Sequence, residues 1–315
     1  MTSPDPGSDP DPDPDDVPQF LDVDDLTPEE LASVLTRATD LKERQERGKH
    51  HPLLAGEALG MIFEKPSTRT RVSFETGMSQ LGGHALFLGP DDIQLGHGEP
   101  IKDTARALSR YLDLLMARMF DHGDVAELAE YATIPVINGL TDDAHPCQTL
   151  ADLLTIRERH EGFDATVAWV GDGNNVCQSF LLGAAMVGLD VHVATPPGYE
   201  PDDATLDRAA ELGGAPALTH DPTEAVEGAD VVYTDVWVSM GQEDERAEKL
   251  AAFEAGDFRV TRELLGDRSL MHCLPAHRGE EVTDEALESE NSIVWDQAEN
   301  RLHAQKGLMA VLRNA

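Results

Sequence analysis

Five consecutive residues near position 70 carry hydrogen-bond donors of the kind that hold an anion. Ser67, Thr68 and Thr70 supply hydroxyl groups, and Arg69 and Arg71 supply guanidinium forks that match the oxygens of a phosphate. Because five donors fall within five residues of a very acidic chain, we expect them to act together as an anion site. The alternative is an ordinary capped helix start with two solvated arginines.

This run of donors lies at a predicted turn from a strand into a helix. The apolar residues 59–63 predict a buried strand, and apolar side chains recurring through residues 74–81 predict a helix that ends at Gly82 and Gly83. The start of a helix presents unpaired backbone N–H groups and the positive end of the helix dipole, which stabilise an anion by about 0.3–1 kcal/mol. The expected local structure therefore strengthens the prediction of an anion site.

Further clusters with polar residues lie at the ends of predicted strands or after them. They are Arg118, which closes its strand, His145 with Gln148, Asn175, Asp235 with Ser239 and Met240, and Cys273 with Leu274. Parallel sheets bind ligands beyond the carboxyl ends of their strands, so two facing sheets would close a cleft. The first half of the chain would supply a cationic wall and the second half a neutral to acidic wall. This arrangement predicts an anion, a phosphate, and a partner that bears an amine as the substrates.

Three of these residues have simpler explanations. His145 alone could be a buried structural histidine, although its spacing places it on the same helical face as Gln148. Asp235 could be an exposed carboxylate, but at a strand end in a cleft it would pair with an ammonium group. Cys273 could be a nucleophile; we favour a positioning role because the neighbouring His272 would point the opposite way on a strand.

The usual nucleotide-binding motifs are incomplete or missing. Gly171 and Gly173 follow a predicted strand, but Val176 stands where G-x-G-x-x-G requires its third glycine, so we do not expect NAD. The chain has no G-x-x-x-x-G-K-[ST] sequence, which argues against a P-loop. Its three cysteines form no C-x-x-C pair. We therefore predict neither a cofactor nor a metal site.

Strand-like and helix-like segments alternate along the chain. The alternation predicts an α/β fold of two doubly wound parallel-sheet domains with the active site in the cleft between them. We expect the Asp-Pro repeats of residues 1–19 to form a disordered acidic tail. The first domain is assigned to residues 20–150, onto which a C-terminal helix at 298–315 packs back, and the second to residues 151–297. The predicted strands lie at residues 59–63, 84–88, 114–118, 135–138, 165–170, 191–194, 231–234, 269–272 and 293–295.

The charge balance excludes several classes of partner. The 315 residues include 24 Lys and Arg against 60 Asp and Glu, which gives a formal net charge of -36. Such a chain repels nucleic acid and anionic lipid, and it contains no apolar run long enough to span a membrane. We expect a cytoplasmic protein adapted to a salt-rich solvent, because about 1 M salt shortens the Debye length to about 3 Å and screens the self-repulsion.

The motifs resemble those of the aspartate/ornithine carbamoyltransferase family from about Phe20 to the C-terminus. Ser67 to Arg71 and the sequence His145-Pro146-Cys147-Gln148 resemble the two carbamoyl-phosphate signatures of the family. Asp235-Val236-Trp237-Val238-Ser239-Met240-Gly241 and His272-Cys273-Leu274-Pro275 resemble the ornithine branch. The first domain would then bind carbamoyl phosphate and the second L-ornithine, and the reaction would give citrulline and phosphate.

The resemblance also implies a role for each matching residue. Carbamoyl phosphate would be held by Ser67, Thr68, Arg69, Thr70, Gln94, Arg118, His145, Gln148, Cys273, Leu274 and Arg301, with Gln94 reaching into a neighbouring subunit. Four of these residues would act in catalysis: Arg118, His145, Cys273 and Arg301. Ornithine would be held by Asn175, Asp235, Ser239 and Met240. The family assembles as trimers, so we expect a homotrimer or a multiple of trimers.

Two alternatives to ornithine transfer stay open at this point. The first is a carbamoyltransferase for another amine such as putrescine, against which the Ser239-Met240-Gly241 segment argues. The second is a non-catalytic protein that binds a phosphate metabolite on the same scaffold. The sequence does not separate the citrulline-forming direction in the cell from the reverse direction.

Overall fold

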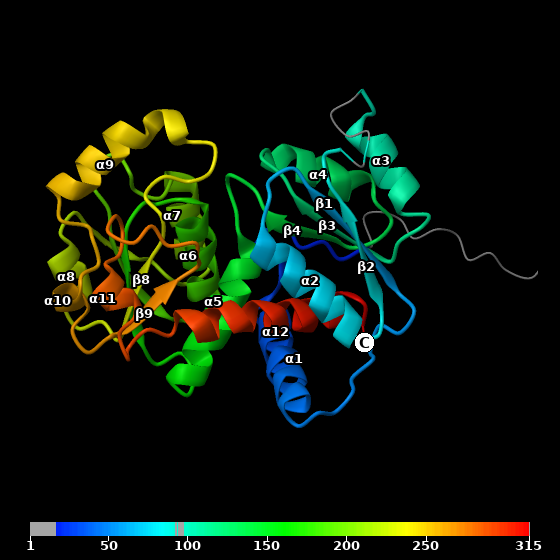
Figure 1. Ribbon diagram of the computed structural model, residues 1–315, viewed down its shortest axis with the longest axis horizontal. Helices are drawn as coiled ribbons and strands as arrows, with labels where there is room; N and C mark the ends of the chain where they lie inside the picture. Colours follow the sequence, from blue (N-terminus) through cyan, green and yellow to red (C-terminus); the bar gives the residue numbers. More distant parts are fainter. Residues whose placement is uncertain (1–16, 92, 94–97, 315) are drawn as a thin grey trace, which may run out of the picture.

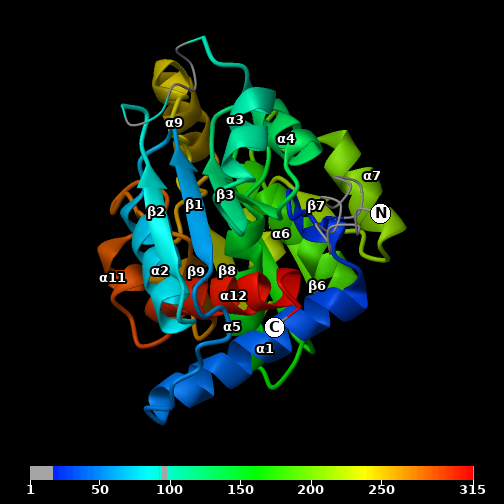
Figure 2. The same ribbon diagram turned by 90° about the vertical axis from the view of Figure 1, so that its right-hand side faces the viewer.

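The computed structural model describes residues 17–91, 93 and 98–314. Its first half is a four-stranded parallel sheet in the order β2-β1-β3-β4. Figure 2 shows β2, β1 and β3 side by side. The strands and helices of this half are β1 (Ala58–Phe63), β2 (His84–Leu88), β3 (Leu114–Arg118), β4 (Val136–Leu140), α1 (Pro28–Glu46), α2 (Thr68–Gln80), α3 (Ile101–Leu108) and α4 (His122–Tyr131), preceded by the 3-10 turn η2 (Val23–Asp25).

The second half is a five-stranded parallel sheet in the order β7-β6-β5-β8-β9. Its strands are β5 (Thr166–Val170), β6 (Asp190–Ala194), β7 (Ala217–Thr219), β8 (Val231–Thr234) and β9 (Ser269–His272). Its helices are α6 (Asn175–Val187), α7 (Asp203–Glu211), α8 (Pro222–Val226), α9 (Arg246–Ala255), α10 (Arg262–Leu265) and α11 (Asp284–Leu287), with the 3-10 turn η3 (Glu243–Glu245). The predicted fold class, two α/β units with parallel sheets, is confirmed.

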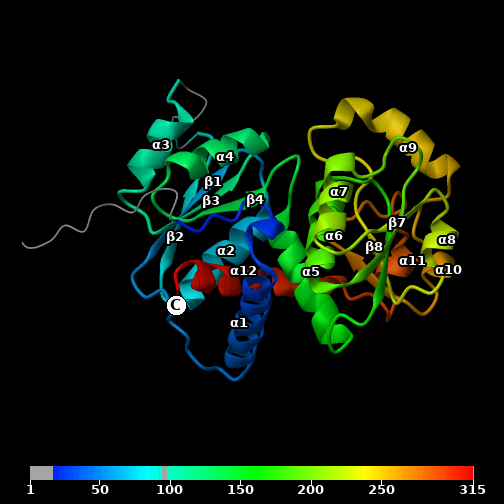
Figure 3. The ribbon, with the colours of Figure 1, turned by 180° about the vertical axis from the view of Figure 1, so that it is seen from behind.

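Two long helices run between the halves. Helix α5 (Pro146–Arg159) follows β4, and Figures 1 and 3 show it between the two sheets. Helix α12 (Val294–Leu312) packs against α1, α2 and α5. Its start is tied to the second sheet, where Ile293 N donates to Leu270 O (3.0 Å). Further along, the buried Lys306 donates to Gln45 of α1 and Gln80 of α2, each at 2.8 Å.

The strand predicted at residues 293–295 is wrong. In the structure only an isolated bridge joins Ser292 to Leu270, and Val294 already begins α12. A three-residue apolar run has too little periodicity to separate a strand from a helix start, and here the packing of α12 decides. The short edge strand β7 was not predicted, and its three residues are largely exposed, so they lack the apolar pattern of a buried strand.

Among the described residues, no helix combines the length and the apolar character needed to cross a membrane.

Candidate active site

The turn after β1 places an open helix N-terminus at the carboxyl end of the first sheet. Ser67 caps α2, and its Oγ accepts a hydrogen bond from Thr70 N (3.2 Å). The first turn of α2 contains no acidic residue, so the dipole is not neutralised locally. Thr70 is buried, Arg69 is half-buried and Thr68 is exposed. Arg71, by contrast, forms an ion pair with Glu75 of the same helix, and its guanidinium lies over the Phe87 ring. The expectation that all five donors act together is therefore wrong for Arg71, and Ser67, Thr68, Arg69 and Thr70 lie at the start of α2.

Strand register brings Arg118 to this turn. Arg118 ends β3 and pairs with Phe63, the last residue of β1, while Glu64 N donates to Arg118 O (2.9 Å). The side chain is 8% exposed, and its Nε has no hydrogen-bond partner among the described residues. Burial, followed by the charges of the nearby Arg301 and Arg69, lowers the pKa of Arg118 to about 10. A buried cation next to two others is costly, and an anion between them would offset that cost.

His145 is held neutral among these cations. It precedes α5 and is buried, and its Nε2 lies 3.5 Å from Arg301 Nη1. Burial, followed by the charges of Arg301, Arg118 and Arg69, lowers the pKa of His145 well below its usual value. Because a guanidinium can only donate, this contact favours the tautomer with the proton on Nδ1, an atom without a partner in the described structure. A neutral imidazole with a free donor suits a hydrogen bond to a carbonyl oxygen.

Arg301 joins three elements of the site. It reaches in from α12, where its Nη1 donates to Gln148 Oε1 (2.6 Å) and its Nη2 donates to Thr70 Oγ1 (3.3 Å). Gln148 lies on the first turn of α5 and Thr70 on the first turn of α2. The structure therefore gathers Thr70, Arg118, His145, Gln148 and Arg301 at one place, although they are far apart in sequence.

The second sheet contributes an acidic wall. The register of β8 and β9 pairs Thr234 with His272, which places Asp235 beside Cys273. Asp235 is 4% exposed; its Oδ1 accepts from Cys273 Sγ (2.9 Å) and its Oδ2 from Asn174 Nδ2 (2.9 Å). Burial and then Asp235 raise the pKa of the Cys273 thiol, so it stays protonated. A protonated thiol is a poor nucleophile, which supports a positioning role.

The turn after Cys273 has a constrained backbone. Leu274 has a φ of +61°, which is uncommon for a residue with a side chain, and its N–H donates to His272 Nδ1 (2.9 Å). Since the N–H of Leu274 is already bonded, its carbonyl oxygen is the backbone group left to contact a ligand.

The remaining predicted ornithine contacts lie near the meeting point of the two halves. Asn175 begins α6 and donates to Thr141 O of the first half (2.6 Å). Ser239 N donates to Gln242 Oε1 (3.3 Å), and Met240 is 46% exposed. A Cβ atom at position 241 would lie 3.8 Å from Phe120, so this segment crosses toward the loop after β3. Gln94 lies outside the described residues.

The structure adds residues that the sequence analysis did not single out. Asn174 binds Asp235, and Asp152 binds Gln148 through Gln148 Nε2 (2.7 Å). The contact between Gln148 and Asp152 could have been predicted from their spacing of four residues on one helix, because such pairs share a face.

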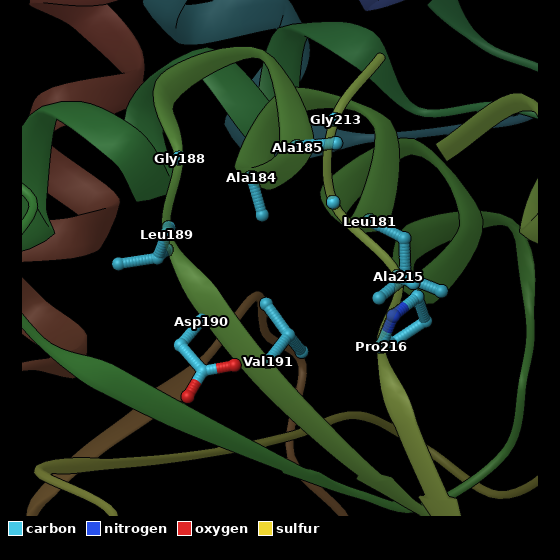
Figure 4. A pocket seen from close by; sticks show the side chains of 11 residues that line it. Leu181, Ala184, Ala185, Gly188, Leu189, Asp190, Val191, Gly213, Ala215 and Pro216 are labelled. Atoms are coloured by element: carbon cyan, nitrogen blue, oxygen red, sulfur yellow. The ribbon is translucent and has the colours of Figure 1, made fainter. Parts of the chain in front are cut away.

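A separate cavity lies away from this site. Its volume is about 200 Å³, and Figure 4 shows its lining of mostly small and apolar side chains, with Asp190 as the charged one. Asp190 begins β6, so the cavity is at the amino end of that strand, opposite the edge where parallel sheets bind ligands. We do not assign it to the active site.

Comparison with known proteins agrees with this geometry. The profile described as aspartate/ornithine carbamoyltransferase, carbamoyl-P binding domain, matches residues 19–158. The profile of the Asp/Orn binding domain of the same family matches residues 164–312.

Individual relatives match over nearly their whole length. The chain is 64% identical to an ornithine carbamoyltransferase of Haloquadratum walsbyi over 296 residues, covering 93% of this chain and 97% of the relative. The solved structure of ornithine carbamoyltransferase from Pyrococcus furiosus is 55% identical, with a TM-score of 0.89 and coverage of 93% and 96%. The anabolic ornithine carbamoyltransferase from Campylobacter jejuni is 39% identical, with a TM-score of 0.87 and coverage of 94% and 99%. With both domain profiles matched in order across the two sheets, the chain belongs to the aspartate/ornithine carbamoyltransferase family.

Proposed function

We propose that this chain transfers the carbamoyl group of carbamoyl phosphate to the δ-amine of L-ornithine, giving citrulline and phosphate within arginine metabolism. The observation that carries the proposal is the neutral His145, which contacts Arg301 (3.5 Å) and whose pKa is lowered by burial and by the charges of Arg301, Arg118 and Arg69. The relatives named above carry the name ornithine carbamoyltransferase, which supports ornithine as the acceptor.

The phosphate end of the substrate would lie at the start of α2. Ser67, Thr68, Arg69 and Thr70 supply hydroxyl, guanidinium and backbone N–H donors to its oxygens. The unpartnered Nε of Arg118 and Nδ1 of His145 donate to the carbonyl oxygen. A dianion at this place would compensate the clustered positive charge, which accounts for the cost of burying Arg118.

The carbamoyl nitrogen needs acceptors, because an NH₂ group donates two hydrogen bonds. Gln148 Oε1 and the carbonyl oxygen of Leu274 are suited to this task. Arg301 contacts Gln148 Oε1, and the turn that carries Leu274 is anchored by the bond from the Cys273 thiol to Asp235. The amine nitrogen of ornithine attacks the carbonyl carbon and forms a tetrahedral intermediate. The bond from that carbon to the bridging oxygen then breaks, and phosphate leaves with the electron pair and takes up the proton that the amine nitrogen loses.

Ornithine would approach from the second sheet. Asp235 is a buried carboxylate suited to the α-ammonium group, and Asn175, Ser239 and Met240 complete the proposed contacts. We further propose that residues 20–150 together with the C-terminal helix form the carbamoyl-phosphate domain and residues 151–297 the ornithine domain. The packing of α12 on α1 and α2 supports this division.

A colorimetric assay for carbamoylated amine, run in high salt with carbamoyl phosphate and a panel of amines, tests the function. We expect citrulline from ornithine at rates far above those with putrescine. Faster turnover of putrescine would favour the alternative acceptor. Calorimetric binding of carbamoyl phosphate without product from any amine would favour a non-catalytic binding protein.

We also propose a homotrimer, or a multiple of trimers, in the cytoplasm. An apolar surface supports an interface on the first half: Val72 of α2 is 53% exposed, and Leu86 of the edge strand β2 is 44% exposed. Beside them the guanidinium of Arg71 lies 3.9 Å from the centre of the Phe87 ring. Exposed apolar patches of this kind commonly mark protein interfaces. Light scattering in high salt should give a mass of three, or a multiple of three, chains of 34.2 kDa, and a monomeric mass would refute the assembly.

Removing salt should destabilise the protein. The excess carboxylates behind the net charge of -36 repel one another. The Debye length grows from about 3 Å at 1 M salt to about 10 Å at 0.1 M, so this repulsion is screened less in dilute salt. We expect the melting temperature to fall by about 10 °C or more over this range, which corresponds to a few kcal/mol for domains of this size. Differential scanning fluorimetry and residual activity measure the effect. Full and lasting activity in low-salt buffer would contradict it.

A further inference from the structure

A fully buried carboxylate lies behind the site and connects its two walls. Asp152 is on α5, one turn after Gln148, and is 0% exposed. Its Oδ1 accepts from Gln148 Nε2 (2.7 Å) and from Gln297 Nε2 of α12 (2.7 Å). Its Oδ2 accepts from the hydroxyl of Tyr233 on β8 (2.8 Å). Three neutral donors from three elements therefore converge on one carboxylate.

The carboxylate dictates which way the Gln148 amide faces. An ionised carboxylate only accepts hydrogen bonds, so Gln148 must present its NH₂ group to Asp152. Its Oε1 then points the other way, where it accepts from Arg301 Nη1 (2.6 Å). Burial raises the pKa of Asp152 to about 6 and its hydrogen bonds oppose that rise, so the acceptor form predominates above neutral pH.

The same constraint extends to the second wall through Gln297. Because Gln297 also gives its NH₂ group to Asp152, its Oε1 accepts from the backbone N–H of His272 (2.8 Å). His272 Nδ1 in turn accepts from Leu274 N (2.9 Å), and its Nε2 donates to the buried Glu281 (3.1 Å). Asp152 is thereby linked to the turn that carries Cys273 and Leu274.

We infer that Asp152 is a positioning residue for carbamoyl transfer, which orients the Gln148 carbonyl and the Cys273–Leu274 turn so that both present acceptors to the carbamoyl NH₂ group. The inference rests on the proposed function for the identity of the substrate. The inference concerns only the carbamoyl end of that substrate, where Asp152 acts. The phosphate end is held by the start of α2.

Replacing Asp152 with asparagine tests this role, since the shape is kept but one acceptor becomes a donor. Gln148 or Gln297 must then turn or lose its partner. In high salt, we expect kcat/KM for carbamoyl phosphate to fall by about 30-fold or more, a loss in the range typical of an unsatisfied buried polar group. The inhibition constant of inorganic phosphate should stay within threefold of that of the parent protein, because its site is untouched.

The matched control is Asp207→Asn, the same change made to an exposed aspartate of α7 outside the proposed site, and we expect kcat/KM within about threefold of the parent. Citrulline formation by the parent is measured first, so its absence would refute the proposed function separately. An Asp152→Asn enzyme within threefold of the parent, or a phosphate inhibition constant that worsens in parallel, would overturn the inference.

Gln297→Met provides a second test should Asp152→Asn fail to fold. This substitution breaks the link to His272 and leaves the Asp152–Gln148 contact in place. We expect a loss of about tenfold in kcat/KM for carbamoyl phosphate, again with phosphate inhibition unchanged. Unaltered kinetics would show that the contact between Gln297 and His272 does not help to position the Cys273–Leu274 turn.

Discussion

Replacing Arg118 with glutamine should lower kcat by about 10²–10³-fold, the usual cost of losing one donor to a developing oxyanion. The side chain is 8% exposed, and its Nε is a buried donor without a partner in the described structure. Negative charge appears on the carbonyl oxygen only as the amine attacks. The charge of Arg118 therefore stabilises the transition state more than the bound substrate, and the loss should appear mainly in kcat rather than in KM.

Arg106→Gln is the matched control for this substitution. Arg106 is exposed on α3, where it pairs with Asp103 and lies over the Tyr131 ring. It lies outside the proposed site, so its kinetics should stay within about twofold of those of the parent protein. Initial rates at saturating ornithine and varied carbamoyl phosphate measure both variants. An Arg118→Gln enzyme that keeps kcat but raises KM would assign Arg118 to ground-state binding instead.

The fold was predictable where local pattern and packing agree. Residues 58–63 form an unbroken apolar run that is buried throughout in β1, and Ser67 caps the helix that follows it. Parallel strands then bring their carboxyl ends to one edge, which is why residues at the ends of separate strands or after them, such as Arg118 and His145, meet in space.

What could not be predicted depends on contacts between distant parts of the chain. Gln297 binds Asp152, which lies 145 positions earlier in the sequence, and no local pattern predicts such a pair. The start of α12 was misassigned for the same reason, because residues 293–295 are helical or extended according to what they pack against.

The structure also explains the glycines that suggested a nucleotide site. A Cβ atom at Gly173 would lie 2.2 Å from the backbone N of Pro201, and Gly173 N donates to Tyr199 O (2.8 Å). The glycine is therefore required for close packing of two backbone segments. Asp172, next to it, forms a buried ion pair with Lys249 (2.6 Å). Close packing and this ion pair therefore explain the loop at residues 171–173. Val176 in place of the third glycine likewise argues against a nucleotide site there.

The rate of carbamoyl transfer should rise steeply with pH, because only the neutral δ-amine can attack. An alkylamine has a pKa of about 10.4, so its neutral fraction grows about tenfold for each pH unit below that value. We expect kcat/KM for ornithine to rise by roughly 10²-fold between pH 7 and pH 9. Among the residues of the site that the structure describes, none is a strong base that would alter this slope: the pKa of His145 is lowered, the Cys273 thiol stays protonated, and Asp235 already accepts two hydrogen bonds.

The rise should level off near pH 10, where the amine becomes largely neutral. Burial lowers the pKa of Arg118, but a phosphate dianion bound beside it would raise that pKa again, so Arg118 stays charged during turnover. His145 is neutral across the whole window and contributes no inflection. Initial rates at low ornithine between pH 6.5 and pH 10.5, at constant high salt, give the profile. A flat profile from neutral pH upward would show that amine deprotonation does not control the rate. In the Arg118→Gln enzyme the rise should persist with the same slope at a lower rate, because the amine still titrates in the same way.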